Sequence, residues 1–367
     1  MANAPCTEVE HCAVGEFDLI RRFFIWPTPQ AVLGVGDDCA LLQSAPGMQL
    51  AISTDMLVSG RHFFADTDPQ GLGHKCLAVN LSDLAACGAR PVAFTLALAL
   101  PEANPAWLEP FAQGLLALAD AHGCELIGGD TTRGPLNICI TVLGEVPAQS
   151  LAARKPPLPT SALLRSGAQA GDDVYVSGTL GDAALALQAL QGRVTLPTEV
   201  LAQARQRLER PSPRVALGLA LRNIASACAD VSDGLTGDLG HILERSGLGA
   251  QVDTEGLLQL LAARQGFPGG GAQFDQQVGA ALDPQQPEGL ALRCVLAGGD
   301  DYELVFCADP TQRAAVQAAA TRSGTPVTRI GTMQAAPGLR LVDGLGCTVA
   351  PPCASFDHFS ASGSRPA

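Results

Sequence analysis

The fold is decided by residues 73–88, GHKCLAVNLSDLAACG. Small and apolar residues run through this stretch and Gly88 follows it, which predicts a buried helix that ends at the glycine. Short apolar runs at 50–53 and 94–100 predict strands on either side of the helix. A helix between two strands is typical of an α/β or α+β protein, and Asp83 places one carboxylate in its largely apolar sequence.

The 367 residues favour two domains. Beyond the first helix, the pattern predicts a helix at 107–122 and strands at 126–127 and 136–146. After a proline-rich stretch it predicts strands at 173–177, 228–231, 302–308 and 327–332 and helices at 181–190, 236–246 and 311–323. We therefore predict domains at 1–148 and 167–359, a linker at 149–166 and a tail at 360–367. Residues 264–291, rich in Gly, Pro and Gln, are predicted to be a mobile insertion.

Composition excludes several classes of protein. The formal net charge of −13 argues against binding nucleic acid or an anionic membrane surface. No apolar run reaches the length of about 18 residues that a membrane span needs, and the N-terminus lacks a basic region followed by an apolar one. Twelve cysteines without a C-x-x-C pair favour reduced thiols. We expect a cytoplasmic protein.

Four aspartate-bearing segments lie within the first 130 residues, each beside an apolar run or among glycines. They are Gly36-Asp37-Asp38, Ser53-Thr54-Asp55, Asn80-Leu81-Ser82-Asp83 and Gly128-Gly129-Asp130. Carboxylates and hydroxyls are the oxygen ligands that Mg²⁺ prefers. Each segment alone is as well explained by turn chemistry, in which Asp and Ser are common. Together they predict a site for clustered divalent cations.

The second half carries two further acidic loops, Asp230-Val231-Ser232-Asp233-Gly234 and Gly298-Gly299-Asp300-Asp301-Tyr302-Glu303. The first repeats the Asn/Asp-x-Ser-Asp pattern of residues 80–83, and either loop could be a solvated turn. His62, seven residues after Asp55, could reach the same site or lie on the surface. There is no G-x-x-x-x-G-K-[ST] loop, no G-x-S-x-G elbow and no H-E-x-x-H pair.

In this order and spacing the segments resemble the thiamine-monophosphate kinase family of the aminoimidazole ribonucleotide synthetase superfamily. The resemblance also includes Thr131-Thr132-Arg133-Gly134 and Arg210-Pro211-Ser212-Pro213-Arg214, and it covers nearly the whole chain. It implies a two-domain α+β fold that dimerises through the N-terminal sheet. It also implies direct transfer of the γ-phosphoryl group of ATP to thiamine monophosphate, assisted by several Mg²⁺ ions, in thiamine diphosphate biosynthesis.

The resemblance also implies roles for individual residues. No residue would act as a covalent nucleophile or as a required general base. Metal ligands would be Asp37, Ser53, Thr54, Asp55, Asp83, Asp130, Asp230 and Asp233; Gly129, Asp130, Arg165 and Ser232 would contact ATP; and His62, Asp300 and Phe356 would line the thiamine phosphate site.

Three departures from the family pattern and two alternatives accompany this interpretation. Asp300 stands where the family usually has Glu, Met56 stands where it usually has Thr, and residues 149–163 are longer than the typical linker. The alternatives are another enzyme of the superfamily, such as aminoimidazole ribonucleotide synthetase or selenophosphate synthetase, and a non-catalytic protein that kept the fold. Selenophosphate synthetases usually carry a reactive Cys or Sec beside a lysine near the N-terminus, and neither Cys6 nor Cys12 stands in such a context.

Overall fold

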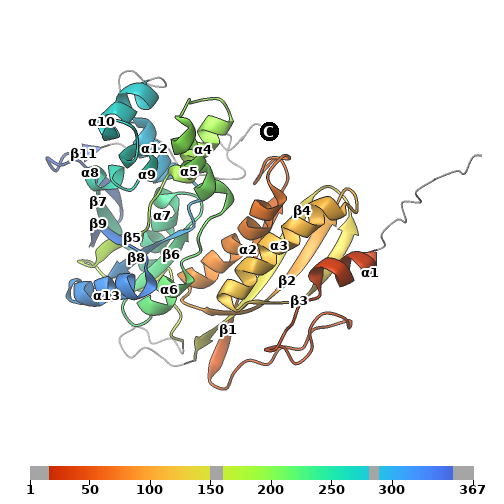
Figure 1. Cartoon of the computed structure of the whole chain (residues 1–367). Coiled ribbons are helices and arrows are strands. Elements are labelled where there is room, and N and C mark those ends of the chain that lie inside the picture. The colour runs from red at the N-terminus through yellow and green to blue at the C-terminus, as the bar shows by residue number, and fades with distance from the viewer. Residues whose placement is uncertain (1–15, 149–159, 281–288, 350–367) are drawn as a thin grey trace, which may run out of the picture.

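The computed structural model describes residues 16–148, 160–280 and 289–349 (Figure 1). Two sheets organise the chain, one built from residues 48–147 and the other from residues 173–349. Helices pack against both sheets, which confirms the mixed fold class. In the part of the chain that the structure describes, no helix has the length and apolar character needed to cross a bilayer.

The N-terminal sheet has four strands in the order β1-β4-β2-β3. They are β1 (Met48–Val58), β2 (Arg90–Leu100), β3 (Glu125–Arg133) and β4 (Asn137–Pro147). Helices α2 (Pro69–Ala86) and α3 (Pro105–His122) cover one face of this sheet (Figure 1). α1 (Glu16–Leu19) and the π-helical η1 (Ile20–Phe24) precede the sheet. Phe23 and Phe24 of η1 are buried in the apolar core that the sheet forms with α2 and α3.

Exposed and less exposed side chains alternate along residues 50–57 of β1. Ser53 and Asp55 pair with Val142 and Ile140 of β4, which are buried, so they lie on the face that the helices cover. Ile52 and Met56 lie on the opposite face and are 62% and 53% exposed. We call this second face of the N-terminal sheet the open face.

Glycines allow α2 and α3 to pack closely. A Cβ at Gly73 would lie 2.0 Å from the carbonyl oxygen of Phe111, and one at Gly114 would lie 1.9 Å from that of Gln70. Any side chain at either position would push the two backbones apart. The same close approach joins α2 to the second unit, where a Cβ at Gly218 would lie 2.0 Å from the carbonyl oxygen of Ala85.

The second sheet has seven strands in the order β11-β10-β7-β9-β5-β8-β6. They are β5 (Asp173–Ser177), β6 (Ala227–Val231), β7 (Gly249–Asp253), β8 (Glu303–Ala308), β9 (Val327–Gln334), β10 (Gly338–Val342) and β11 (Thr348–Val349). Every residue of β5, β6 and β8 is buried, as expected for strands covered on both faces.

Helices surround this sheet, and α2 of the first unit packs against the side where β6 and α6 lie. In chain order they are α4 (Asp182–Leu190), α5 (Thr198–Glu209), α6 (Val215–Leu221), α7 (Leu235–Ser246), α8 (Thr254–Leu258), α9 (Ala262–Gln265), α10 (Gly270–Phe274), the π-helical η2 (Asp275–Gly279), α12 (Gly289–Ala297), the 3-10 turn η3 (Pro310–Gln312) and α13 (Arg313–Ser323). One apolar core runs from Leu77 and Leu81 in α2 to Leu217 in α6 and Phe306 in β8.

The expectation of a mobile insertion at 264–291 is wrong for its described part. Residues 264–280 form α9, α10 and η2, and α12 begins at Gly289. Phe267, Phe274 and Val278 are at most 5% exposed and belong to the second core. These three apolar side chains, which a composition dominated by Gly, Pro and Gln conceals, anchor the segment.

Candidate functional site

Two cavities adjoin in the cleft between the two units. The first, of about 310 Å³, is lined by Phe63, Phe64, Leu187 and Leu208 among others, and we call it the apolar cavity. The second, of about 200 Å³, is lined by Asp55, Asp83, Asp230 and Asp233 among others, and we call it the acidic cavity. Arg61, His62, Lys75 and Asp300 line both, so the two cavities meet at these four side chains.

A third cavity of about 410 Å³ shares Asp83 and Asp230 with the acidic cavity. Arg165 and Arg245 line it, and we call it the arginine cavity. The three cavities therefore follow one another, from an apolar end, through a carboxylate-lined centre, to an end that presents guanidinium groups.

The motif at residues 80–83 places each of its polar side chains against a different partner. The Asn80 side-chain oxygen accepts from the backbone N–H of Asp55 at 3.1 Å, and its Nδ2 donates to the carbonyl of Cys76. Ser82 Oγ donates to Asp230 at 2.9 Å, and Ser53 Oγ donates to Asp83. Asp83 is thereby held beside β1, and Asp230 beside α2.

Asp230 lies near the end of β6, and Asp233 lies in the turn that follows it. Asp238, in the first turn of α7, accepts from the backbone N–H groups of Ser232 (3.0 Å) and Asp233 (3.1 Å) and so fixes the turn. The repeated Asn/Asp-x-Ser-Asp segments thus meet in space, because Ser82 of one bonds to Asp230 of the other.

Electrostatics in the acidic cavity disfavour ionised carboxylates. Burial, with repulsion from Asp83 and Asp233, raises the pKa of Asp55 to about 6. Burial also raises the pKa of Asp83, against the opposing effects of the Ser53 hydrogen bond and Arg165. The pKa of Asp230 lies well above its ordinary value, chiefly through burial and then through Asp83 and Asp238. When ionised, the five carboxylates that line the cavity would outnumber its two cations, Arg61 and Lys75.

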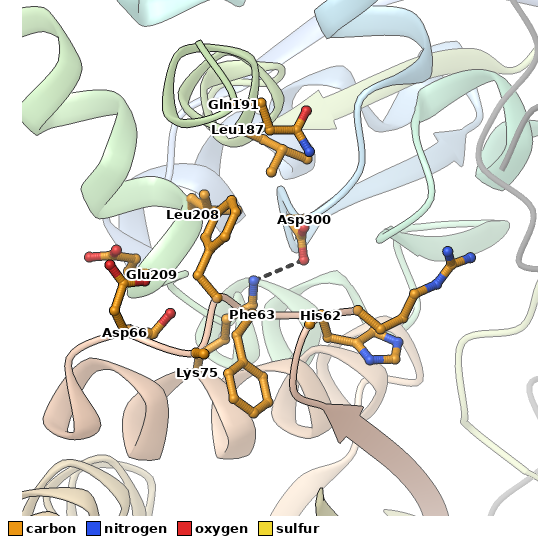
Figure 2. Close-up of a pocket in the computed structure, with 14 residues that line it drawn as sticks. His62, Phe63, Asp66, Lys75, Leu187, Gln191, Leu208, Glu209 and Asp300 are labelled. Carbon is orange, nitrogen blue, oxygen red and sulfur yellow. Dashed lines mark ion pairs between the residues drawn. The ribbon is translucent and has the colours of Figure 1, made fainter. Parts of the chain in front are cut away.

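Lys75 and Asp300 join the two units where the apolar and acidic cavities meet. Lys75 Nζ of α2 lies 3.0 Å from Asp300 Oδ1, and their side chains are 4% and 11% exposed. Figure 2 shows Lys75 reaching toward Asp300, with Leu187 and Gln191 across the cavity from them. Tyr302 Oη donates to the same carboxylate at 3.2 Å.

The loop that carries Asp300 has an unusual backbone. Asp300 and Tyr302 have φ angles of 69° and 52°, in the left-handed region that side chains other than Gly rarely adopt. The backbone N–H groups of Asp300 and Tyr302 donate to the carbonyls of Ser232 and Val231, at 2.9 and 2.8 Å. Strained residues held by surrounding hydrogen bonds are typical of functional loops.

His62 has a defined tautomer. Its Nδ1 accepts from the backbone N–H of Val58 at 3.0 Å, so in the neutral ring the proton is on Nε2. The hydrogen bond closes the tight turn after β1 and fixes the imidazole at the wall shared by the apolar and acidic cavities.

The structure gathers most of the predicted site residues. Asp55, Asp83, Asp230, Ser232, Asp233, His62 and Asp300 line the acidic cavity, and Ser53 and Arg165 line the arginine cavity. Within 16–148, 160–280 and 289–349, however, no three His, Cys, Asp or Glu side chains converge closely enough to form a ready metal site. Phe356 lies outside the described residues.

The remaining predicted residues lie elsewhere in this chain. Asp37 is exposed in the loop before β1, and Thr54 lies on the open face, where its Oγ1 is 2.9 Å from that of Thr141. Asp130 aligns with Ala97, Cys139 and Met56 across the sheet, so it lies on the open face as well. Its strand is three strand spacings, about 14 Å, from β1.

Gly129, next to Asp130, has a φ of 150°, and a Cβ there would lie 1.9 Å from the carbonyl oxygen of Leu96. A register shift between Phe94 and Thr95 accompanies this close approach of β3 to β2. Only glycine fits at this position.

Sequence reasoning did not assign Lys75 and Arg61 to the site. Lys75 lies in the middle of the helix that the pattern predicted to be buried, and a buried lysine requires a partner. The scarcity of lysine in the chain, with only Lys75 and Lys155, was the available signal.

Residues 36–146 match the family described as AIR synthase related protein, N-terminal domain, and residues 169–344 match its C-terminal domain. A thiamine-monophosphate kinase from Salmonella typhimurium is 44% identical over 354 residues, which covers 95% of this chain and 99% of the relative.

Two solved structures are also similar. The crystal structure of a thiamine-monophosphate kinase from Stenotrophomonas maltophilia K279a has a TM-score of 0.71 at 45% identity, covering 85% of this chain and 91% of that one. A structure described as AaThiL complexed with AMPPCP and TMP has a TM-score of 0.65 at 26% identity, covering 86% and 89% of the two chains.

Proposed function

This chain belongs to the AIR synthase related family and, within it, to the thiamine-monophosphate kinases, and we propose that the interdomain cleft is where it performs their reaction. It is an ATP-dependent kinase that converts thiamine monophosphate to thiamine diphosphate. The observation that carries the assignment to the cleft is the order of its cavities, apolar, acidic and arginine-lined. In that order the cavities would receive the rings of the acceptor, the reacting phosphates and the nucleotide.

The acidic cavity suits divalent cations. Its carboxylates offer the oxygen ligands that Mg²⁺ prefers, and burial, with repulsion from Asp83 and Asp233, raises the pKa of Asp55. We propose that Asp55, Asp83, Asp230 and Asp233 hold several Mg²⁺ ions, with Ser53 beside them. When bound, these ions would offset the negative charge of the reacting phosphates.

The chain itself needs to supply little proton chemistry. The second pKa of a phosphate monoester is about 6, so the acceptor is largely a dianion at neutral pH and needs no general base. An acceptor phosphate oxygen forms a bond to the γ-phosphorus of ATP, and the bond from that phosphorus to the β–γ bridging oxygen breaks, leaving ADP. The contribution of the protein is to align the two phosphates and exclude water.

We propose that the apolar cavity receives the rings of the acceptor and that the arginine cavity receives phosphates of ATP. Arg165 would contact the nucleotide from the arginine cavity. His62 and Asp300, which line the junction of the apolar and acidic cavities, would contact thiamine monophosphate.

A second copy of the chain would complete this site. The open face exposes Ile52 and Met56 and also carries Asp130, which is too far from Asp55 to share a cation with it in one chain. We propose that two open faces pack together in a homodimer, so that Gly129 and Asp130 of one copy serve the cleft of the other. Asp37 and Thr54, also outside the cleft, would act from the same interface.

We also propose a cytoplasmic location. Nine cysteines lie in the described residues, and all are free thiols. Reduced thiols are typical of a reducing compartment.

One assay tests the proposed function. ADP production is measured with Mg²⁺ and ATP, with and without thiamine monophosphate. Strong stimulation by thiamine monophosphate is expected, because this compound is not the acceptor for the other enzymes of the superfamily or for a non-catalytic relative. ADP production that ignores thiamine monophosphate would contradict the assignment.

A further inference from the structure

Lys75 is a buried cation in an unusual position. It is 4% exposed in the middle of α2, and it lines both the apolar and the acidic cavity. Its ammonium group carries three N–H donors, and the ion pair with Asp300 Oδ1 uses one of them. A buried ammonium is costly unless its donors are used, so two donors are available for a ligand at the junction of the cavities.

Asp300 explains why a cation is needed at this junction. An ionised Asp300 would repel an anionic ligand that enters the acidic cavity, and Asp55, Asp83 and Asp230 would add to the repulsion. Lys75 lies 3.0 Å from Asp300 and offsets its charge. The pair therefore removes a barrier to an anion and at the same time presents donors to it.

The acceptor of the proposed reaction has an aromatic end, formed by its two rings, and an anionic end, its phosphate. If its rings occupy the apolar cavity, its phosphate must enter the acidic cavity past the residues that line both. Figure 2 shows the Lys75 ammonium group at this passage, between Phe63 on one side and Leu187 on the other. The helix that carries Lys75 is rigid, since α3 and α6 pack closely against it.

We propose that Lys75 binds the phosphate of the acceptor and determines the preference for thiamine monophosphate over unphosphorylated thiamine. The inference rests on the proposed function and adds a specificity residue to it. Asp300 holds the ammonium group in place, and Lys75 donates to the acceptor phosphate while the rings lie in the apolar cavity.

Arg61 is the competing candidate, because it lines both cavities too. It lies in the turn after β1 and is only partly buried, whereas Lys75 is on a packed helix. A cation that is already buried and fixed loses less side-chain entropy when it binds a ligand. For this reason the structure favours Lys75.

The test is calorimetric binding of thiamine monophosphate and of thiamine, with Mg²⁺ present, to the wild type and to Lys75→Met, Arg61→Met and Arg322→Met. Arg322 is exposed on α13 and controls for the loss of one positive charge. Lys75→Met should weaken binding of the monophosphate by about tenfold or more, the effect of one lost charged hydrogen bond, and leave thiamine binding unchanged. Arg322→Met should change neither.

Three results would overturn the inference. The first is a wild type that binds thiamine monophosphate and thiamine with equal affinity. The others are a Lys75→Met variant whose affinity for both compounds falls equally or not at all, and a loss of the preference in Arg61→Met but not in Lys75→Met. ADP production by the wild type distinguishes a failure of this inference from a failure of the proposed function. If thiamine monophosphate does not stimulate ADP production, the proposed function is wrong. If it does, a negative binding result concerns only the role of Lys75.

A second pair of variants guards against misfolding, because Lys75→Met leaves Asp300 without its cation. The double variant Lys75→Met/Asp300→Asn removes both charges of the ion pair, so no carboxylate is left opposite the methionine. We expect Asp300→Asn alone to keep some preference for the monophosphate and the double variant to lose it. Equal preference in these two variants would also overturn the inference.

Discussion

Asp55 is the residue at which the proposed cation binding in the acidic cavity is tested. Asp55→Asn keeps the size of the side chain and removes its charge. We expect kcat to fall by about 100-fold or more, because a ligand of the proposed cations is lost. Thermal stability should stay the same or rise, since burial and repulsion from Asp83 and Asp233 disfavour the ionised form.

Steady-state kinetics and thermal unfolding check this expectation together. Glu244→Gln, a neutralised carboxylate exposed on α7, is the matched control and should leave both quantities unchanged. Full activity in Asp55→Asn with intact folding would show that the carboxylate is not needed for turnover.

The sequence predicted correctly that some of the acidic segments lie together, but not all of them. Residues 80–83 lie on a helix that packs against β1 and β6, and this packing places Asp83 near Asp55 and Asp230. Asp130 was expected just after a strand at 126–127, but it lies within β3, and the strand order places β3 at the far edge of the sheet from β1. Strand order results from the packing of the whole domain, and local pattern does not reveal it.

At the scale of single elements, β3 depends on one glycine. Gly129→Ala would place a Cβ 1.9 Å from the carbonyl oxygen of Leu96, at a φ of 150°. We expect this variant to lose about 2 kcal/mol or more of unfolding free energy. Gly128→Ala is the control, because the nearest atom to its Cβ would be 4.0 Å away.

Urea unfolding of the two alanine variants gives the comparison. The neighbouring glycine, which has an ordinary φ, should tolerate alanine with a loss of less than about 1 kcal/mol. Equal losses in both variants would mean that the close approach of β3 to β2 does not constrain Gly129.

Asp173 of β5 links three elements and predicts a pH dependence. It is 1% exposed and accepts from Arg313 of α13 and Arg329 of β9. The Arg313 hydrogen bond, aided by Arg329, lowers the pKa of Asp173 despite its burial. A lowered folded-state pKa stabilises the protein above the unfolded pKa of about 3.9, and this stabilisation is lost as the pH falls through the folded-state value.

Asp173→Asn should therefore cost about 2 kcal/mol of unfolding free energy at pH 7, as expected for charged hydrogen bonds. The difference between the variant and the wild type should shrink at pH 3. Urea unfolding at both pH values measures it. A difference that stays constant between the two would rule out the ionised carboxylate as the cause.

The sequence revealed the secondary structure unevenly. β5 has the predicted bounds, 173–177, because a short apolar run flanked by turn residues is a clear signal. α5, at 198–209, was not predicted, since its sequence is largely polar and only Val200, Ala204 and Leu208 are buried. We propose 149–166 as the linker, of which 149–159 lie outside the described residues.

At the scale of the whole molecule, the proposed dimer makes the open face essential. Ile52→Asp places a charge on this face, and we expect it to convert the dimer to a monomer because burying an unpaired carboxylate is unfavourable. ADP production should fall with it, because Asp130 of the partner would be lost from the cleft.

Sedimentation velocity reports the oligomeric state. Leu345→Asp, at a side chain that is 90% exposed in the second unit, is the control and should leave the dimer intact. If the wild type sediments as a monomer and is active, Asp130 does not need a partner copy, and the dimer proposal fails.

The central claim is that the cleft transfers a phosphoryl group from ATP to the phosphate of thiamine monophosphate. The most direct measurement is ³¹P NMR of a reaction that contains the protein, Mg²⁺, ATP and thiamine monophosphate. The two phosphorus signals of thiamine diphosphate are expected to grow in step with those of ADP, while inorganic phosphate does not accumulate. ADP formed together with inorganic phosphate, while thiamine monophosphate stays unchanged, would contradict it.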